Sequence, residues 1–251
     1  MTTIDVNADA GESFGRWVLG DEVSLFAFVS SANIACGHHA GDPSTMRAAV
    51  QEARNAGVAV GAHPGYDDKV GFGRRAIAMS IEETADSVVY QVGALAAIAA
   101  SEGVQLRHVK PHGAMMGAIC RDPELAVGVA TGLRSAGFEL PLMMAPTPAL
   151  TAVRTAGHPV IPENAVDLDF DEDGINVIEP RPAAKDPDGV ADTALRVAGG
   201  RAVAVSGRSI EMPVRSVCVH GDRPNAVPIA AAVNRALTAA GFEIRPAEPW
   251  V

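Results

Sequence analysis

The sequence contains few cysteines and no long apolar run. Its three cysteines, Cys36, Cys120 and Cys218, are odd in number and lack the spacing of metal-binding motifs, which favours reduced thiols over disulfides. We expect Cys36 and Cys218 to act as small buried apolar residues and not as nucleophiles. The longest apolar stretch, residues 88–100, is too short to span a bilayer, and the N-terminus does not resemble a signal peptide. These features predict a soluble, cytoplasmic protein with no membrane partner.

Positive charge is also scarce. The chain has 20 Lys and Arg residues but 30 Asp and Glu residues, so its formal net charge is −10. Nucleic acids and anionic membranes are therefore not expected as partners. The chain has no GxxxxGKS or GxxxxGKT phosphate loop, and its segments GESFG and GFGRR do not match a dinucleotide fingerprint. The motifs thus identify no nucleotide site within the chain.

Glycine and apolar residues are abundant, and they follow an alternating plan. The chain has 251 residues, of which 48% are hydrophobic and 25 are glycine, and no linker divides it, so we expect a single domain over residues 1–251. Apolar segments short enough for buried strands alternate with helical segments about seven times. The expected strands cover residues 4–8, 32–36, 58–62, 106–109, 140–144, 160–161 and 217–219. This alternation predicts a βα barrel or a closely related parallel sheet.

Helix boundaries are marked by capping residues. Asp42 and Pro43 predict a helix start, Gly57 predicts its end, and Ser80 with acidic residues after it predicts another start. The expected helices cover residues 20–30, 43–56, 80–101, 122–137, 148–156, 188–198 and 225–240. The acidic, proline-rich residues 167–189 are expected to form an excursion or lid, and residues 202–205 to be extended.

Polar residues gather just after the expected strands. They are Asn7, Asp9, Glu12, His38, His39, His63, Lys110, His112, His220 and Asp222. A closed barrel brings the carboxyl ends of its strands to one rim, so these residues should surround one pocket. It also places the last strand beside the first, so we expect His220 and Asp222 close to Asn7 and His63. An open sheet would hold them at opposite edges.

Several of these residues also have simpler interpretations. Asp9 and Glu12 could cap a turn, Lys110 could be a surface lysine, and Asp222 could cap the helix that starts near residue 225. Arg74 and Arg75, in a glycine-rich loop after His63, are either a solvated pair or a clamp for a carboxylate or phosphate.

The segments NADAGESFG, SSANIACGHHAGDP, GVAVGAHPGYDDKVGFGRR, YQVGAL, HVKPHGA and CVHGD together resemble the LamB/YcsF family, known in bacteria as the A subunit of 5-oxoprolinase. The resemblance spans essentially the whole chain. It implies an α/β fold, the distorted seven-stranded (β/α) barrel of the glycoside hydrolase/deacetylase type. It also implies opening of 5-oxo-L-proline to L-glutamate, with ATP as co-substrate, in a complex with two other subunits.

Two segments depart from the family pattern. Where relatives usually read HVKPHGALYN, this chain has Met116 and Gly117 in place of Tyr and Asn. Where they usually read FADR, it has Asn164, Ala165, Val166 and Asp167, without the arginine. We expect the barrel to survive these changes, while the substrate or the activity is open to change.

The strand-end positions suggest roles. We assign Asp9 or His112 as the base, Glu12 as a further catalytic residue, Lys110 as the charge stabiliser and Arg74 or Arg75 as the carboxylate clamp. The remaining substrate contacts are expected from Asn7, Asn33, His38, His39, His220 and Asp222.

Two other functions stay open. In one, Asp9, His63 and His112 hold a divalent metal in a deacetylase or amidohydrolase, although pocket histidines are often only acid–base residues. In the other, the chain binds the lactam, the chemistry occurs on a partner, and the chain itself is not catalytic. The sequence is also compatible with a homo-oligomer.

Overall fold

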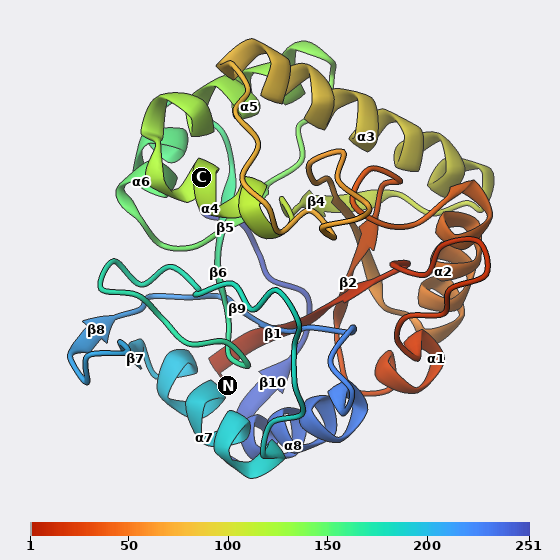
Figure 1. The fold of residues 1–251 in the computed structure, drawn as a ribbon. Helices are drawn as coiled ribbons and strands as arrows, with labels where there is room; N and C mark the ends of the chain where they lie inside the picture. Colours follow the sequence, from red (N-terminus) through yellow and green to blue (C-terminus); the bar gives the residue numbers. More distant parts are fainter. Residues whose placement is uncertain (1) are drawn as a thin grey trace.

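Seven parallel strands close into a barrel in the computed structural model, which describes residues 2–251 (Figure 1). They are β1 (Thr2–Ala10), β2 (Ser31–Ala35), β3 (Ala59–His63), β4 (Leu106–Val109), β5 (Leu142–Met144), β6 (Val160–Ala165) and β9 (Ser216–Val219). The barrel closes because β1 pairs with β2 on one side and with β9 on the other. It is distorted where β4 and β5 share only the pair Val109 and Leu142. The predicted seven-stranded barrel is confirmed.

Helices surround the barrel (Figure 1). They are α1 (Glu22–Leu25), α2 (Pro43–Ala56), α3 (Ile81–Ser101), α4 (Gly113–Arg121), α5 (Pro123–Ser135), α6 (Pro148–Thr155), α7 (Pro187–Ala198) and α8 (Ala226–Ala239). The predicted caps are present: the Asp42 side chain accepts two backbone N–H bonds at the start of α2, and Gly57 ends it with a φ of 71°. Ser80 and Glu83 form a capping box at α3. These local signals explain why most helix starts could be predicted.

The first strand shows how the barrel interior becomes polar. Ile4, Val6 and Ala8 are buried in the hydrophobic core, while Asp5, Asn7 and Asp9 alternate with them and are equally buried. Because side chains alternate across a strand, one set faces the helices and the other faces the barrel interior. The polar face of β1 therefore runs along the inside of the barrel to its rim.

Four local predictions were wrong or incomplete. The helix expected over residues 20–30 is only the short α1. Helix α4 was not predicted, because it begins at a glycine, Gly113, with a φ of 51°. Strands β7 (Arg201–Val203) and β8 (Ser209–Glu211) form a separate antiparallel pair. The last strand is not β9 but β10 (Phe242–Ile244), which pairs with the start of β1 outside the closed barrel.

The segment between β6 and α7 crosses the mouth of the barrel. It contains no helix or regular strand, and Leu168, Ile175 and Ile178 line the main pocket. Arg223 holds it in place by donating to the backbone carbonyls of Asp167 and Ala183. The expected excursion is thus an ordered pocket wall. Among residues 2–251, no helix is both long and apolar enough to cross a bilayer.

Candidate active site

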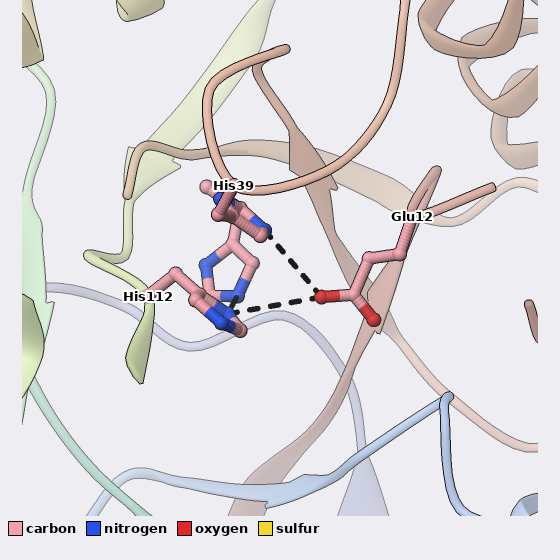
Figure 2. A group of neighbouring side chains, drawn as sticks. Glu12, His39 and His112 are labelled. Carbon is pink, nitrogen blue, oxygen red and sulfur yellow. Dashed lines mark hydrogen bonds and ion pairs between the residues drawn. The ribbon is translucent and has the colours of Figure 1, made fainter. Parts of the chain in front are cut away.

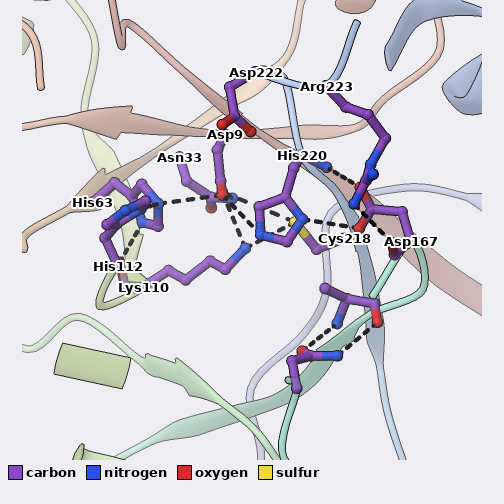
Figure 3. Close-up of polar contacts among 12 residues, drawn as sticks. Asp9, Asn33, His63, Lys110, His112, Asp167, Cys218, His220, Asp222 and Arg223 are labelled. Atoms are coloured by element: carbon purple, nitrogen blue, oxygen red, sulfur yellow. Dashed lines mark hydrogen bonds and ion pairs between the residues drawn. The ribbon is translucent and has the colours of Figure 1, made fainter. Parts of the chain in front are cut away.

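The Lys110 ammonium lies at the centre of a buried polar group at the barrel rim (Figure 3). Lys110 follows β4, and its Nζ lies 3.0 Å from Asp9 Oδ1, 3.2 Å from Asn7 Oδ1 and 2.9 Å from Cys218 Sγ. Glu163 Oε1, from β6, lies 3.3 Å from the same nitrogen. Three strands thus supply acceptors to one cation that is only 5% exposed. Lys110 is not a surface lysine.

Neighbouring charges keep this group ionised. Burial by itself raises the pKa of Asp9, but the charges of His63 and Lys110 outweigh it and hold that pKa well below its usual range. Burial likewise opposes the charge of Lys110, but the neighbouring carboxylates, Asp9 first, raise the Lys110 pKa well above normal. Burial and Asp9 raise the pKa of Cys218 well above normal, so it remains a thiol. The expected absence of a reactive thiolate at Cys218 agrees with this environment, although Cys218 contacts the lysine and is not a simple core residue.

Asp9 is positioned by a chain of side-chain hydrogen bonds inside the barrel. Asn33 Nδ2 donates to Asp9 Oδ1 at 2.9 Å and to Asn7 Oδ1 at 2.6 Å, and His108 Nε2 donates to Asn33 Oδ1 at 2.7 Å. Gly61 makes room for this histidine, since a Cβ there would lie 2.0 Å from His108 Nε2. Asn33 and Asn7 therefore orient Asp9 and Lys110 from within the barrel. Sequence reasoning missed His108 because it lies inside β4 and not after it.

Asp167 and His220 form a buried acid–imidazole pair. His220 Nδ1 lies 2.8 Å from Asp167 Oδ1, and the His220 backbone N–H donates to Asp167 Oδ2 at 3.1 Å. Burial opposes protonation of His220, but Asp167 outweighs it and raises the His220 pKa, while His220 and Arg223 lower the pKa of Asp167. His220 Nε2 points back toward Asp9 Oδ2, 3.7 Å away (Figure 3). Asp167 was missed because the predicted strand stopped at residue 161, well short of it.

The closed barrel places both chain halves at one pocket, as predicted. His220 and His63 line the same pocket, and both contact Asp9, which neighbours Asn7 on β1. Strand β9 pairs Asn7 with Cys218 in parallel register.

A second buried group contains three histidines and one carboxylate (Figure 2). The His39 and His112 rings stack with centroids 3.8 Å apart, and Glu12 Oε1 lies 3.5 Å from His39 Nε2 and 3.7 Å from His112 Nδ1. His63 Nε2 lies 3.0 Å from His112 Nδ1. Burial lowers the pKa of His39 and of His112 well below normal and raises that of Glu12 well above it. The four side chains could together bind a metal ion.

This set differs from the predicted metal ligands. His63 and His112 belong to it, but Glu12 and His39 complete it in place of Asp9. Asp9 Oδ2 lies 3.3 Å from His63 Nε2, but Asp9 Oδ1 forms an ion pair with the Lys110 ammonium. The sequence could not separate the two groups, because all these residues follow strands.

The two candidate arginines lie in different environments. Arg74 lines the pocket and pairs with Asp222 at 2.9 Å. Arg75 has a 64% exposed side chain and bonds to Asp68, so it lies outside the pocket. The alternative role of Asp222 as a helix cap is not seen, because α8 begins after Asn225 and Asp222 faces Arg74.

His38 also lies apart from the two buried groups. It is half-buried and stacks on Tyr90, with ring centroids 5.4 Å apart. Among the predicted site residues, His38 and Arg75 are therefore the two that are not brought into the pocket or its buried surroundings.

The pocket has one polar side and one apolar side. Asp9, Lys110, Glu163 and His220 line the polar side. The apolar side includes Met116, Gly117, Cys120, Leu168, Ile175 and Ile178. Glu163 Oε1 is buried and makes a 3.3 Å ion pair with Lys110 but no hydrogen bond among residues 2–251, so it can accept one from a bound molecule. The two family departures in α4, Met116 and Gly117, thus belong to the pocket wall.

Comparison with known proteins identifies similar chains. The LamB/YcsF family model matches residues 4–251. A protein of Chloroflexus aggregans, named as the A subunit of 5-oxoprolinase, is 45% identical, covering 98% of this chain and 99% of that protein. The crystal structure of a lactam utilization protein from Thermus thermophilus is 42% identical with a TM-score of 0.87, covering 97% of this chain and 99% of that one. A polysaccharide deacetylase from Bacillus cereus, 13% identical with a TM-score of 0.53 over 99% of this chain and 93% of that one, shares the fold alone.

Proposed function

Because the chain belongs to the LamB/YcsF family, we propose that it opens 5-oxo-L-proline to L-glutamate as the A subunit of an ATP-dependent 5-oxoprolinase. The observation that carries this proposal is the buried Lys110 ammonium, held beside Asp9 and Glu163 at the polar side of the pocket. A fixed cation at this place stabilises negative charge that develops on an amide oxygen or a transferred phosphoryl group. Two further subunits complete the proposed enzyme in the cytoplasm.

The need for ATP follows from the chemistry of the substrate. A five-membered lactam is a weak electrophile, and phosphorylation of its amide oxygen creates a good leaving group. Water then adds to the activated carbon, and the ring nitrogen leaves as an amine after gaining a proton, which opens the ring to an acyl phosphate. A second water molecule hydrolyses this acyl phosphate to the carboxylate of L-glutamate and inorganic phosphate. Since the chain has no phosphate-loop motif, we assign the phosphorylation step to the complex with its partner subunits.

His220 is the best placed group to move protons. Asp167 holds its Nδ1 at 2.8 Å, which leaves Nε2 directed toward the pocket. Because Asp167 raises the pKa of His220, its imidazole can accept a proton from water and later return it to the leaving nitrogen. Asp9, whose pKa is held low, is a poor base, and so is His112, because burial lowers its pKa well below normal.

Arg74 is the proposed clamp for the substrate carboxylate. Its guanidinium lines the pocket and makes one ion pair, with Asp222 at 2.9 Å. A guanidinium has five N–H donors, so several remain for a second carboxylate. This assignment uses Arg74 and not Arg75, which is bonded to Asp68 at the surface.

The test uses the chain assembled with its two partner subunits, with release of L-glutamate and ADP as the readout. Lys110→Met and His220→Asn should each lower kcat by about 100-fold or more, the range that one stabilising donor or one acid–base group supplies. Arg74→Lys should raise KM for 5-oxo-L-proline, whereas the matched control Arg75→Lys should not. Full turnover by both the Lys110 and the His220 variants would contradict the catalytic roles assigned to these two residues.

The group of three histidines and Glu12 favours a second candidate, a metal-dependent hydrolase of a small amide. A bound metal ion would supply a Lewis acid there. His63 and His112 also line the pocket, which places this group next to a bound amide. Hydrolysis of N-acyl amino acids by the isolated chain without ATP, lost on chelation, would favour this candidate over the first.

The third candidate is a subunit that binds the lactam without catalysis. Met116 and Gly117 line the pocket at positions where relatives usually have two hydrogen-bonding side chains. The loss of these two groups favours a role in binding over a role in catalysis. Turnover of 5-oxo-L-proline by the isolated chain would exclude it. Retained turnover by the assembled Lys110→Met and His220→Asn variants would support it.

A further inference from the structure

Two ring nitrogens face each other in the histidine group with no proton of their own between them. His63 Nδ1 lies 2.6 Å from the Lys110 carbonyl oxygen, and His112 Nε2 lies 2.9 Å from the Phe72 carbonyl oxygen. A carbonyl only accepts, so in each neutral ring that nitrogen carries the proton. The other two nitrogens, His63 Nε2 and His112 Nδ1, then present lone pairs to each other at 3.0 Å. Two facing lone pairs repel each other, so a cation between them, either a proton or a metal ion, would stabilise this contact.

The other two members of the group are also without partners. Glu12 Oε1 and both ring nitrogens of His39 have no hydrogen bond among residues 2–251. The two residues are 3% and 1% exposed, so water does not compensate at the surface. A buried polar atom left unsatisfied costs about 1–3 kcal/mol, and such atoms are rare. Figure 2 shows the Glu12 carboxylate directed at His39 and His112, and His63 belongs to the same group of neighbouring donor atoms.

Three of the six separations between these donor atoms lie within a few tenths of an ångström of the edges of a tetrahedron around a metal ion. They are 3.0 Å between His63 and His112, 3.5 Å between Glu12 and His39, and 3.7 Å between Glu12 and His112. Zinc bonds of about 2.0–2.2 Å in tetrahedral geometry give edges of about 3.3–3.6 Å. All four donor atoms lie within 4.8 Å of one another.

The backbone around the group is shaped to admit the rings. A Cβ at Gly65 would lie 2.5 Å from His39 Nδ1, and a Cβ at Gly73 would lie 2.7 Å from His39 and 2.9 Å from His112. Phe72, between them in the same loop, has a φ of 54°, a rare conformation for a residue with a side chain. Its carbonyl is the one that fixes the proton of His112. This loop therefore both makes room for the stacked rings and determines which nitrogen of His112 carries the proton.

A neighbouring group shows what the histidine group lacks. Asp9, Cys218 and His220 also lie close enough to share a metal ion. There, however, the Lys110 ammonium already lies 3.0 Å from Asp9 and 2.9 Å from Cys218, so that group has its cation. The Arg74 guanidinium near the histidine group is neutralised by Asp222 at 2.9 Å. The orphaned atoms of Glu12 and His39 thus belong to a group that has no cation of its own among the described residues.

We propose that Glu12, His39, His63 and His112 bind one divalent transition metal ion of the zinc type, with all four coordination positions filled by the protein. Imidazole and carboxylate donors suit this class of metal. Four protein ligands leave no open position, which is the pattern of a structural site. Three ligands follow β1, β2 and β4, and His63 is the last residue of β3, so the ion would join the ends of four consecutive strands at the rim. A closed site leaves no position for a substrate oxygen, so this inference argues against the metal-dependent hydrolase and does not depend on the ATP-dependent reaction proposed above.

The first experiment measures metal in the wild-type chain. Protein purified without added metal, and protein dialysed against Zn²⁺, should contain close to one ion per chain by elemental analysis. Chelation should lower the unfolding temperature, and Zn²⁺ should restore it. The Co²⁺-loaded chain should show the intense visible absorption of tetrahedral Co²⁺. Failure of the folded chain to bind Zn²⁺ or Co²⁺ stoichiometrically would overturn the proposal, and weak octahedral Co²⁺ spectra would overturn the closed four-ligand site.

The second experiment tests the ligand set. Glu12→Gln and His39→Gln should each weaken Zn²⁺ binding by more than about 100-fold, beyond the loss that residues behind a ligand cause. The matched control His38→Gln, next in the chain but stacked on Tyr90, should keep one ion per chain. Asp9→Asn should also keep it. Loss of metal from Asp9→Asn but not from Glu12→Gln would overturn the ligand set, and the wild-type Co²⁺ spectrum decides the geometry even if a variant fails to fold.

Discussion

Asp5 and Asp9 lie on the same inward face of β1, and both are almost completely buried, yet their surroundings are opposite. Near the base of the barrel, Asp5 accepts hydrogen bonds from three serines, including Ser30 at 2.6 Å and Ser31 at 2.8 Å. At the rim, Asp9 faces the Lys110 ammonium at 3.0 Å. Burial raises the pKa of Asp5 to about 6, while charged neighbours hold the pKa of Asp9 well below normal.

The comparison shows that partners, and not burial, decide the charge of an internal carboxyl group. Hydroxyl donors only partly offset the cost of removing Asp5 from water, whereas a buried cation more than offsets it for Asp9. At the base of the barrel, Asp5 is therefore stabilised by hydroxyl donors, whereas at the rim Asp9 is stabilised by cations. Each prediction below alters one side of this contrast.

The largest effect is expected from removing the cation at the rim. Lys110→Met leaves Glu163 buried without its ion-pair partner and removes one of the cationic neighbours of Asp9, which should cost about 3–5 kcal/mol in the free energy of unfolding. Urea denaturation at neutral pH measures this loss. Adding Asp9→Asn to the lysine variant should recover part of it, because one unpaired charge is removed. A purely additive double variant would show that the two side chains are not coupled.

The next largest effect concerns pH and the base of the barrel. The folded pKa of Asp5, about 6, is higher than the unfolded value of 3.8, so the folded state binds more protons between them. The contribution of Asp5 to stability should therefore fall by about 3 kcal/mol as pH rises from about 4 through 6, and then stay constant.

Urea denaturation of the wild type and of Asp5→Asn between pH 4.5 and 7.5 checks this. The wild type should lose stability relative to the variant over that interval, because Asn cannot titrate. Parallel profiles for the two proteins would mean that Asp5 does not carry the shift.

An intermediate effect is expected where the base and the rim meet. Gly61→Ala would place a Cβ 2.0 Å from His108 Nε2, which forces His108 away from Asn33 and so loosens Asp9. Overpacking of this kind costs about 1–3 kcal/mol. The matched control is Gly93→Ala in α3, where the nearest atom lies 3.9 Å away and stability should hold or rise. Equal unfolding temperatures for both variants would contradict the tight fit at Gly61.

The smallest effect is expected at the thiol that contacts Lys110. In Cys218→Ser the hydroxyl still accepts a bond from the ammonium, so the change in stability should stay below about 1 kcal/mol. Burial raises the pKa of Cys36 to about 12 and raises that of Cys218 as well, so a small alkylating reagent should inactivate the assembled enzyme only slowly. Rapid inactivation that substrate prevents would show that a thiol takes part in the reaction.

The sequence by itself determined the βα alternation, most helix starts and the strand ends that carry Asp9, His63 and Lys110. These are local properties, because caps depend on residues a few positions apart and strands on short apolar runs. The family segments extended this to a closed barrel. Even the expected meeting of β1 and β9 follows from closure, since a barrel has no free edges.

Only the tertiary structure decided which of these residues act together. Arg74 and Arg75 are adjacent in sequence, but the turn that they share directs one into the pocket and the other to Asp68. Likewise, the structure placed Glu12 and His39 with His63 and His112, and left Asp9 to Lys110. His108, Glu163 and Asp167 entered the site only through contacts with distant strands. Such contacts depend on side-chain direction and on distances of a few ångströms, and strand periodicity alone does not contain either.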